Sequence, residues 1–212
     1  MLHLTRRQLL ICGLGASMAS IGLAHAGELD ALDKMMRSGR IIRRFGVASD
    51  NQIAAYEKVS GTPFSAAYRR FLKRENGLVF VFKNEDAERH GGDLARVLID
   101  MTEFFGVGNG DPSNDLLLLG PRTSFHDAAF TPFATLIGLG GDFCTYVEIN
   151  QGRFKAAIMY TDGEMFSGMR RAREKIAGRT TDDIIGYFTE IGYYFQAAPD
   201  FDSLLAEYAK MA

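Results

Sequence analysis

The sequence is poor in the residues that most often hold small exported domains together. It has no tryptophan and two cysteines, Cys12 and Cys144, among its 212 residues. Cys12 lies in an N-terminal segment typical of an export signal, so removal of that segment leaves Cys144 alone and excludes an internal disulfide. Packing must therefore stabilise the fold, and 16 Phe and 8 Tyr residues supply the large side chains for a core.

An excess of positive charge is also missing. The chain has 24 Lys and Arg residues against 26 Asp and Glu residues. Residues 1–26 contain Arg6, Arg7 and no acidic residue, so the rest of the chain has 22 basic and 26 acidic residues. Nucleic-acid binding needs a basic face that displaces counterions from phosphates. The sequence therefore argues against a nucleic-acid partner, and its mild acidity suits a basic protein partner.

Two loop-like segments resemble ligand-binding motifs only in part. Residues 106–111, Gly-Val-Gly-Asn-Gly-Asp, lack the Gly-Lys-Ser/Thr ending of a P-loop and the G-x-G-x-x-G order. Residues 111–115 begin like a calcium loop, but Leu116 and Arg122 occupy the positions where an EF-hand needs glycine and glutamate. We therefore expect both segments to be turns.

The ionisable residues form no recognisable catalytic set. His90 and His126 have no His or Cys neighbour in the sequence, and Cys144 lies in an apolar run typical of a core cysteine. We expect no catalytic, cofactor-binding or metal-ligating residues, and a protein that is not an enzyme. A cleft with perturbed carboxylates around a predicted hairpin would instead favour an enzyme of small substrates. The acidic residues near that hairpin are our candidate partner-binding surface: Asp142, Glu148, Asp162 and Glu164.

The N-terminal segment has the parts of an export signal. Arg6 and Arg7 precede an uncharged apolar run that ends at Ala24-His25-Ala26, a small-residue cleavage site. The paired arginines resemble the twin-arginine version of the signal, and the general secretory route is the alternative. We expect cleavage after Ala26 and a periplasmic or secreted protein. The other alternative is an uncleaved inner-membrane anchor, although the run is shorter than the ~20 residues of a spanning helix.

The rest of the chain predicts a basic helical spacer over 27–48 and one α+β domain over 49–212. Ser49 is suited to cap a helix that Gly61 ends, and Pro63 is suited to the first turn of a second helix. Asn76-Gly77 ends that second helix, since both residues tolerate the left-handed conformation. Strands are expected over 78–82, 133–139, 143–149 and 154–160, the last two as a hairpin.

The C-terminal part predicts further helices. A helix over 165–177 is followed by one over 184–195, with Thr180 and Asp183 as a capping box, and by a last helix over 201–208 after Pro199. Together these elements predict a mixed or antiparallel central sheet flanked by helices.

Short motifs follow one another along the chain in an order that resembles a known family. Between Ile53 and Phe82 the chain contains Glu57, Thr62-Pro63, Tyr68-x-x-Phe71-Leu72 and Asn76-Gly77 before a strand. This order resembles the opening of the SUKH superfamily (Knr/Smi-like proteins), in which leucine is usual at the position of Thr62. Further similar segments are Phe104-Phe105-Gly106, residues 133–142, Gly152 with residues 154–162, and residues 201–205.

The resemblance covers residues 51–208 and implies a non-enzymatic α+β domain with a mixed sheet flanked by helices. Bacterial relatives are commonly immunity proteins that bind and neutralise toxins, while fungal relatives are regulatory scaffolds. It therefore implies a protein partner, such as a toxin, and no cofactor. Asn76 and Gly77 would close a helix rather than form a site. The alternative partner is a resident envelope protein, bound by a periplasmic regulatory or scaffold adaptor.

Overall fold

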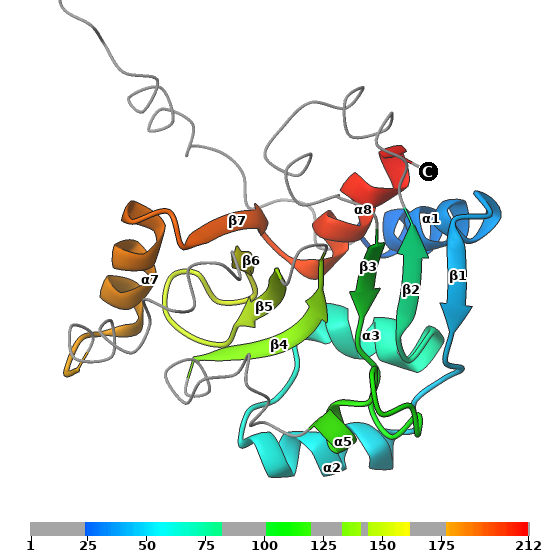
Figure 1. Ribbon diagram of the computed structural model, residues 1–212, viewed down its shortest axis with the longest axis horizontal. Coiled ribbons are helices and arrows are strands. Elements are labelled where there is room, and N and C mark those ends of the chain that lie inside the picture. Colours follow the sequence, from blue (N-terminus) through cyan, green and yellow to red (C-terminus); the bar gives the residue numbers. More distant parts are fainter. Residues whose placement is uncertain (1–23, 82–100, 120–132, 141–143, 162–176, 212) are drawn as a thin grey trace, which may run out of the picture.

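Strands that follow one another along the chain also lie side by side in the sheet. The computed structural model describes residues 24–81, 101–119, 133–140, 144–161 and 177–211. In this part of the chain, seven strands form one antiparallel sheet in the order β1-β2-β3-β4-β5-β6-β7 (Figure 1). Helices pack against this sheet, which confirms the expected α+β single domain with an antiparallel central sheet.

The strands and helices are short. The strands are β1 Ile41–Arg44, β2 Leu78–Val81, β3 Met101–Phe104, β4 Ala134–Leu139, β5 Thr145–Ile149, β6 Ile158–Thr161 and β7 Tyr194–Ala198. The described helices are α1 Ala24–Arg37, α2 Asp50–Ser60, α3 Ala66–Arg74, α5 Leu116–Leu119, α7 Thr181–Glu190 and α8 Phe201–Met211.

Most helix ends lie where their capping residues predict. Ser49 and Gln52 form a reciprocal capping box at the start of α2, and Gly61 ends that helix with φ 73°. Thr180 caps α7 by accepting a hydrogen bond from the backbone N–H of Asp183, but the Asp183 carboxylate accepts from the Thr180 hydroxyl rather than from its backbone N–H, so the predicted capping box is only half formed. The start of α3 differs from the prediction, because Ser65 is the N-cap and Pro63 lies before the helix rather than in its first turn.

Two segments predicted to be helical are instead the edge strands of the sheet. Helix α1 ends at Arg37, and the following Ile41–Arg44 segment of the predicted spacer pairs with β2 as strand β1. The predicted helix over 184–195 ends at Glu190, because Gly192 adopts φ 76°, and the chain continues as β7 along β6. An edge strand pairs with a single neighbouring strand, and that pairing decides its structure. The periodicity of its own sequence does not reveal the neighbour.

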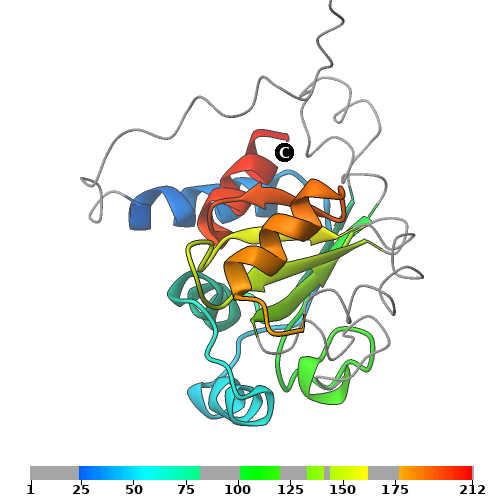
Figure 2. The same ribbon diagram turned by 90° about the vertical axis from the view of Figure 1, so that its left-hand side faces the viewer.

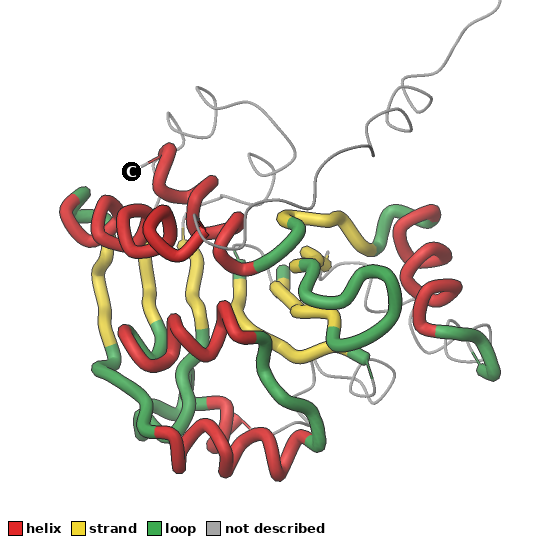
Figure 3. Tube along the Cα trace, turned by 180° about the vertical axis from the view of Figure 1, so that it is seen from behind, coloured by secondary structure: helices red, strands yellow, loops and turns green. Residues whose placement is uncertain are grey.

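Three helices cover one face of the β1–β3 part of the sheet. Seen from behind, α1, α3 and α8 lie in front of these strands (Figure 3). Between the layers, Phe201 of α8 packs against Phe104 of β3 and Phe71 of α3, with ring centroids 5.0 and 5.1 Å away. Helices α2 and α5 lie beyond one end of these strands (Figures 1 and 2). The core is therefore largely aromatic, as the sequence composition suggested.

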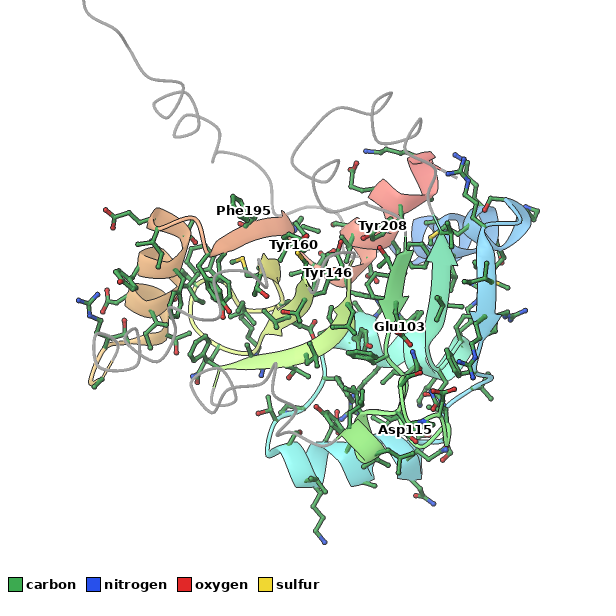
Figure 4. The ribbon with its side chains drawn as sticks, viewed as in Figure 1. Glu103, Asp115, Tyr146, Tyr160, Phe195 and Tyr208 are labelled. Carbon is green, nitrogen blue, oxygen red and sulfur yellow. The ribbon has the colours of Figure 1, made fainter. Side chains whose placement is uncertain are left out.

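A pair of buried hydroxyl groups joins the sheet to its last helix. Tyr146 of β5 and Tyr208 of α8 share a hydrogen bond of 2.6 Å between their hydroxyl oxygens, and Tyr160 of β6 packs beside Tyr146 (Figure 4). Cys144 is buried and forms no disulfide within the described part of the chain, in agreement with its assignment to the core. None of the described helices is long and apolar enough to span a membrane.

Candidate functional site

A pocket of about 360 Å³ lies where the approach to α3 meets the β5–β6 hairpin. Residues 63–66 form one of its walls, and residues 148–150 and 155–156 form the other. These walls come from parts of the chain that are more than 80 residues apart, and the hydrogen bond between Ser65 and Glu148 joins them. The pocket therefore exists only in the folded domain.

The connection between β5 and β6 shapes the second wall. The N–H of Ala156 donates to the carbonyl of Ile149 at 2.7 Å, and the N–H of Ile149 donates to the carbonyl of Ala157 at 3.0 Å. Ala156 has φ 72°, a left-handed conformation that costs a residue with a Cβ roughly 1 kcal/mol or more. The backbone of the pocket wall is thus strained at Ala156, and the hydrogen bonds that join Ala156 and Ala157 to Ile149 hold it there.

Glu148 is the buried ionisable residue among those that line the pocket. Its side chain comes from β5 and the residue is 1% exposed. The backbone N–H of Ser65, the N-cap of α3, donates to Glu148 Oε2 at 3.3 Å. The other oxygen, Oε1, is buried and has no hydrogen-bond partner within the described part of the chain. The positive end of the α3 dipole lies next to this carboxylate and stabilises its charge.

Burial changes the acidity of this group. Loss of solvation raises the pKa of Glu148 from 4.5 to about 6, because water no longer stabilises the charged form. Hydrogen bonds from the hydroxyl and the N–H of Ser65 act in the opposite direction, and the negative charges of Asp200 and Asp202 raise the pKa further. At neutral pH Glu148 is therefore mainly an ionised carboxylate with one unpaired oxygen.

This location corrects one member of the predicted acidic surface. Glu148 was expected among exposed charges that meet a basic partner, but it is buried at the base of a pocket. All five residues of β5 are buried, so Glu148 does not present its charge on the molecular surface. Asp142, Asp162 and Glu164 lie outside the described residues, so their part of that prediction is untested.

The structure describes only some of the residues of the predicted export signal. Arg6 and Arg7 lie outside the described residues. Ala24 and Ala26 fall in the first turn of α1, so the predicted cleavage point after Ala26 lies inside that helix. His90 and His126 are also outside the described residues.

One feature of the sequence, the spacing of residues in β5, indicates that Glu148 is buried. In β5, Glu148 lies two residues after Tyr146, so both side chains point to the same face of the sheet. The large aromatic side chain of Tyr146 on that face, and the apolar residues Val147 and Ile149 on either side of Glu148 in the sequence, indicate burial of the acid. Ser65, Asp200 and Asp202 are far from Glu148 in sequence, and no local pattern connects them.

The loop that resembled ligand-binding motifs forms a turn held by its own side chains. The carboxylate of Asp115 accepts hydrogen bonds from the N–H groups of Gly108 at 2.7 Å and Gly110 at 2.9 Å. Asp111 accepts from the N–H of Ser113 at 2.8 Å. Asp115 and Glu103 both lie in the right-hand half of the view in Figure 4. The carboxylates that suggested a calcium loop are therefore used to close the backbone, which confirms the predicted turn.

No group of three His, Cys, Asp or Glu residues that could hold a metal ion occurs among the described residues. Comparison of the chain with models of known protein families and with curated proteins finds no match. The pocket is therefore interpreted from its own geometry.

Proposed function

We propose that this chain is a non-enzymatic protein-binding domain of the SUKH type, an immunity-type protein that binds and neutralises a toxin in the cell envelope. The observation that carries the proposal is a pocket with a single buried carboxylate, Glu148. Among the described residues that line it, Lys155 is the only other ionisable side chain. An acid–base pair, or a nucleophile with its activating base, needs a second group within reach of the first. One carboxylate with apolar walls suits recognition.

The buried positions of the family-like motifs agree with this proposal. The Tyr68 hydroxyl lies 2.6 Å from the carbonyl oxygen of Phe105 and 2.9 Å from that of Ile137, so it joins α3 to the sheet. The Asn76 side chain accepts from the N–H of Val107 at 2.8 Å and donates to its carbonyl at 3.2 Å. These motif residues therefore act in the fold, which leaves the molecular surface and the pocket for a partner.

A co-expression assay tests the proposal. Cells that produce each toxin encoded beside this gene receive the full chain or an empty vector, and survival is measured. Protection by the full chain against one of these toxins, with recovery of the complex from the envelope fraction, is the expected result. Failure to protect against every neighbouring toxin contradicts the immunity proposal. Recovery of one host envelope protein from cells that lack all of these toxins instead indicates the adaptor function.

A second candidate function is an enzyme of small substrates, and the raised pKa of Glu148 favours it. A carboxylate with a pKa of about 6 in a pocket is suited to act as a general base near neutral pH. This candidate requires turnover of a small ester, amide or glycoside by the purified chain, with a rate that rises with pH through about 6. The rate would be lost in Glu148→Gln. Absence of turnover across such a panel excludes it.

A further inference from the structure

The two oxygens of Glu148 have different surroundings. Oε2 accepts the hydrogen bond from the backbone N–H of Ser65 at 3.3 Å, while Oε1 has no hydrogen-bond partner among the described residues. Both belong to a residue that is 1% exposed. A buried, ionised carboxylate with an unsatisfied oxygen costs free energy, because no donor within the described part of the chain replaces the water that Oε1 has lost. A ligand that brings a charged donor to Oε1 would remove that cost.

The walls of the pocket are suited to an aliphatic chain. Pro63, Phe64, Ala66 and Ala156 line it together with the carboxylate. The cavity of about 360 Å³ is more than ten times the roughly 30 Å³ that a water molecule occupies in the liquid, so several linked methylene groups fit. Long cationic side chains bury such apolar stems while their charged ends reach a polar partner.

The charges around Glu148 favour a cation. Asp200 and Asp202 add negative potential at the carboxylate, and both belong to the segment that opens α8. Arg70 of α3 forms an ion pair of 2.6 Å with Asp202 and offsets part of its charge. Lys155 is the cation that lines the pocket, and it is an exposed residue. An incoming cation is therefore attracted by the acidic groups and opposed by Lys155.

We infer that the Glu148 pocket binds a primary ammonium group on an aliphatic chain, as presented by a lysine of the protein partner. The inference rests on the proposed function in one respect, since it assigns the amine to a protein. A lysine fits better than an arginine because a guanidinium fork pairs with both oxygens of a carboxylate. Oε2 already accepts a hydrogen bond from Ser65, so only Oε1 is left for the ligand, and a compact ammonium group needs no more than one oxygen.

Titration of the full chain with n-butylamine, an analogue of the lysine side chain, tests the inference. Carbon NMR at pH 7.5 follows the side-chain carbonyl carbon of residue 148, a carboxylate in the wild type and an amide in Glu148→Gln, with n-butylguanidine as the comparison ligand. We expect saturable binding of butylamine, at least roughly tenfold weaker in Glu148→Gln because a charged hydrogen bond is lost. Binding should also weaken as the pH falls below about 6 and Glu148 becomes protonated. Equal affinity in Glu148→Gln, or tighter binding of butylguanidine, overturns the inference.

Two further variants separate recognition from loss of the fold. Ala66→Met places a larger side chain at an exposed position of the pocket wall, without touching the carboxylate, and should block butylamine. Lys155→Ala removes the opposing charge and should strengthen butylamine binding several-fold. Circular dichroism confirms the fold of each variant. If both folded variants bind butylamine as the wild type does, the amine does not enter this pocket and the inference is wrong.

The partner assay keeps the two proposals distinguishable. If the wild-type chain recovers no partner but binds butylamine through Glu148, the proposed function fails and the amine site stands. If a partner is recovered equally well by the wild type and by folded Glu148→Gln, the proposed function stands and recognition of a partner lysine by Glu148 is wrong.

Discussion

The backbone N–H of Ser65 donates a hydrogen bond of 3.3 Å to the carboxylate of Glu148, across 83 positions of the chain. This contact places the start of helix α3 against strand β5 and forms the base of the pocket. It also leaves one carboxylate oxygen unpaired in a buried position. The stability of the domain and the ligand preference that we propose for it both depend on that arrangement.

Glu148 should make the domain less stable as the pH rises through the window from about 4.5 to about 6. Its pKa is higher in the folded chain than in the unfolded one, so the folded state binds more protons and its ionisation favours unfolding. The shift of the pKa corresponds to about 2 kcal/mol at neutral pH. In Glu148→Gln, the loss of unfolding free energy across this window should be smaller by about that amount.

Urea unfolding of both proteins at intervals from pH 4 to pH 7 measures this difference. Parallel pH profiles for the wild type and Glu148→Gln would show that the carboxyl group titrates normally in the fold. They would therefore contradict the account of its burial.

The hydroxyl pair of Tyr146 and Tyr208 should contribute to stability as a unit. Each hydroxyl is buried and lies 2.6 Å from the other, and the Tyr208 hydroxyl is also hydrogen-bonded to the side chain of Thr102, so removing either hydroxyl breaks the bond that the pair shares. We expect Tyr146→Phe to cost about 1–2 kcal/mol of unfolding free energy. The double variant with Tyr208→Phe should cost clearly less than the sum of the two single variants. Urea denaturation of the four proteins measures the coupling, and strictly additive costs would contradict it.

Gly77 should tolerate no side chain. Its φ is 108°, and a Cβ would collide with the side-chain oxygen of Asn114 and lie 3.0 Å from the backbone nitrogen of Gly106. We expect Gly77→Ala to cost about 3 kcal/mol, from backbone strain and the collision together. Gly178 is the matched control, because it has φ 75° and open space around it, and Gly178→Ala should cost roughly 1 kcal/mol. Thermal unfolding compares the two, and equal costs would contradict the collision.

The twin arginines should direct export. A fusion of residues 1–35 to a reporter that is active only outside the cytoplasm should give signal, which the double variant Arg6→Lys with Arg7→Lys abolishes if the route is the twin-arginine one. Mass spectrometry of the exported full chain should give Gly27 as the first residue. Unchanged export of the double variant assigns the general secretory route, and a retained N-terminus in the membrane fraction assigns an anchor.

Elements defined by their own end residues could be predicted from the sequence. Ser49 with Gln52, Thr180 with Asp183, and Asn76-Gly77 act within a few residues of one another, so their effects are visible in a short segment. Strands β1 and β7 could not be predicted in this way. Each depends on one neighbouring strand, β2 for the first and β6 for the second, and that neighbour is not encoded in local periodicity.

The sequence alone determined the α+β class, the caps and turns, and the aromatic core, because these follow from short-range spacing and composition. It also identified Glu148 as a residue of interest, but with the wrong surroundings. Only the tertiary structure decided that this carboxylate is buried, that Ser65 occupies one of its oxygens, and that Asp200 and Asp202 raise its pKa. Desolvation and charge interactions depend on distance in space, and these groups come together only when α3, β5 and the start of α8 pack.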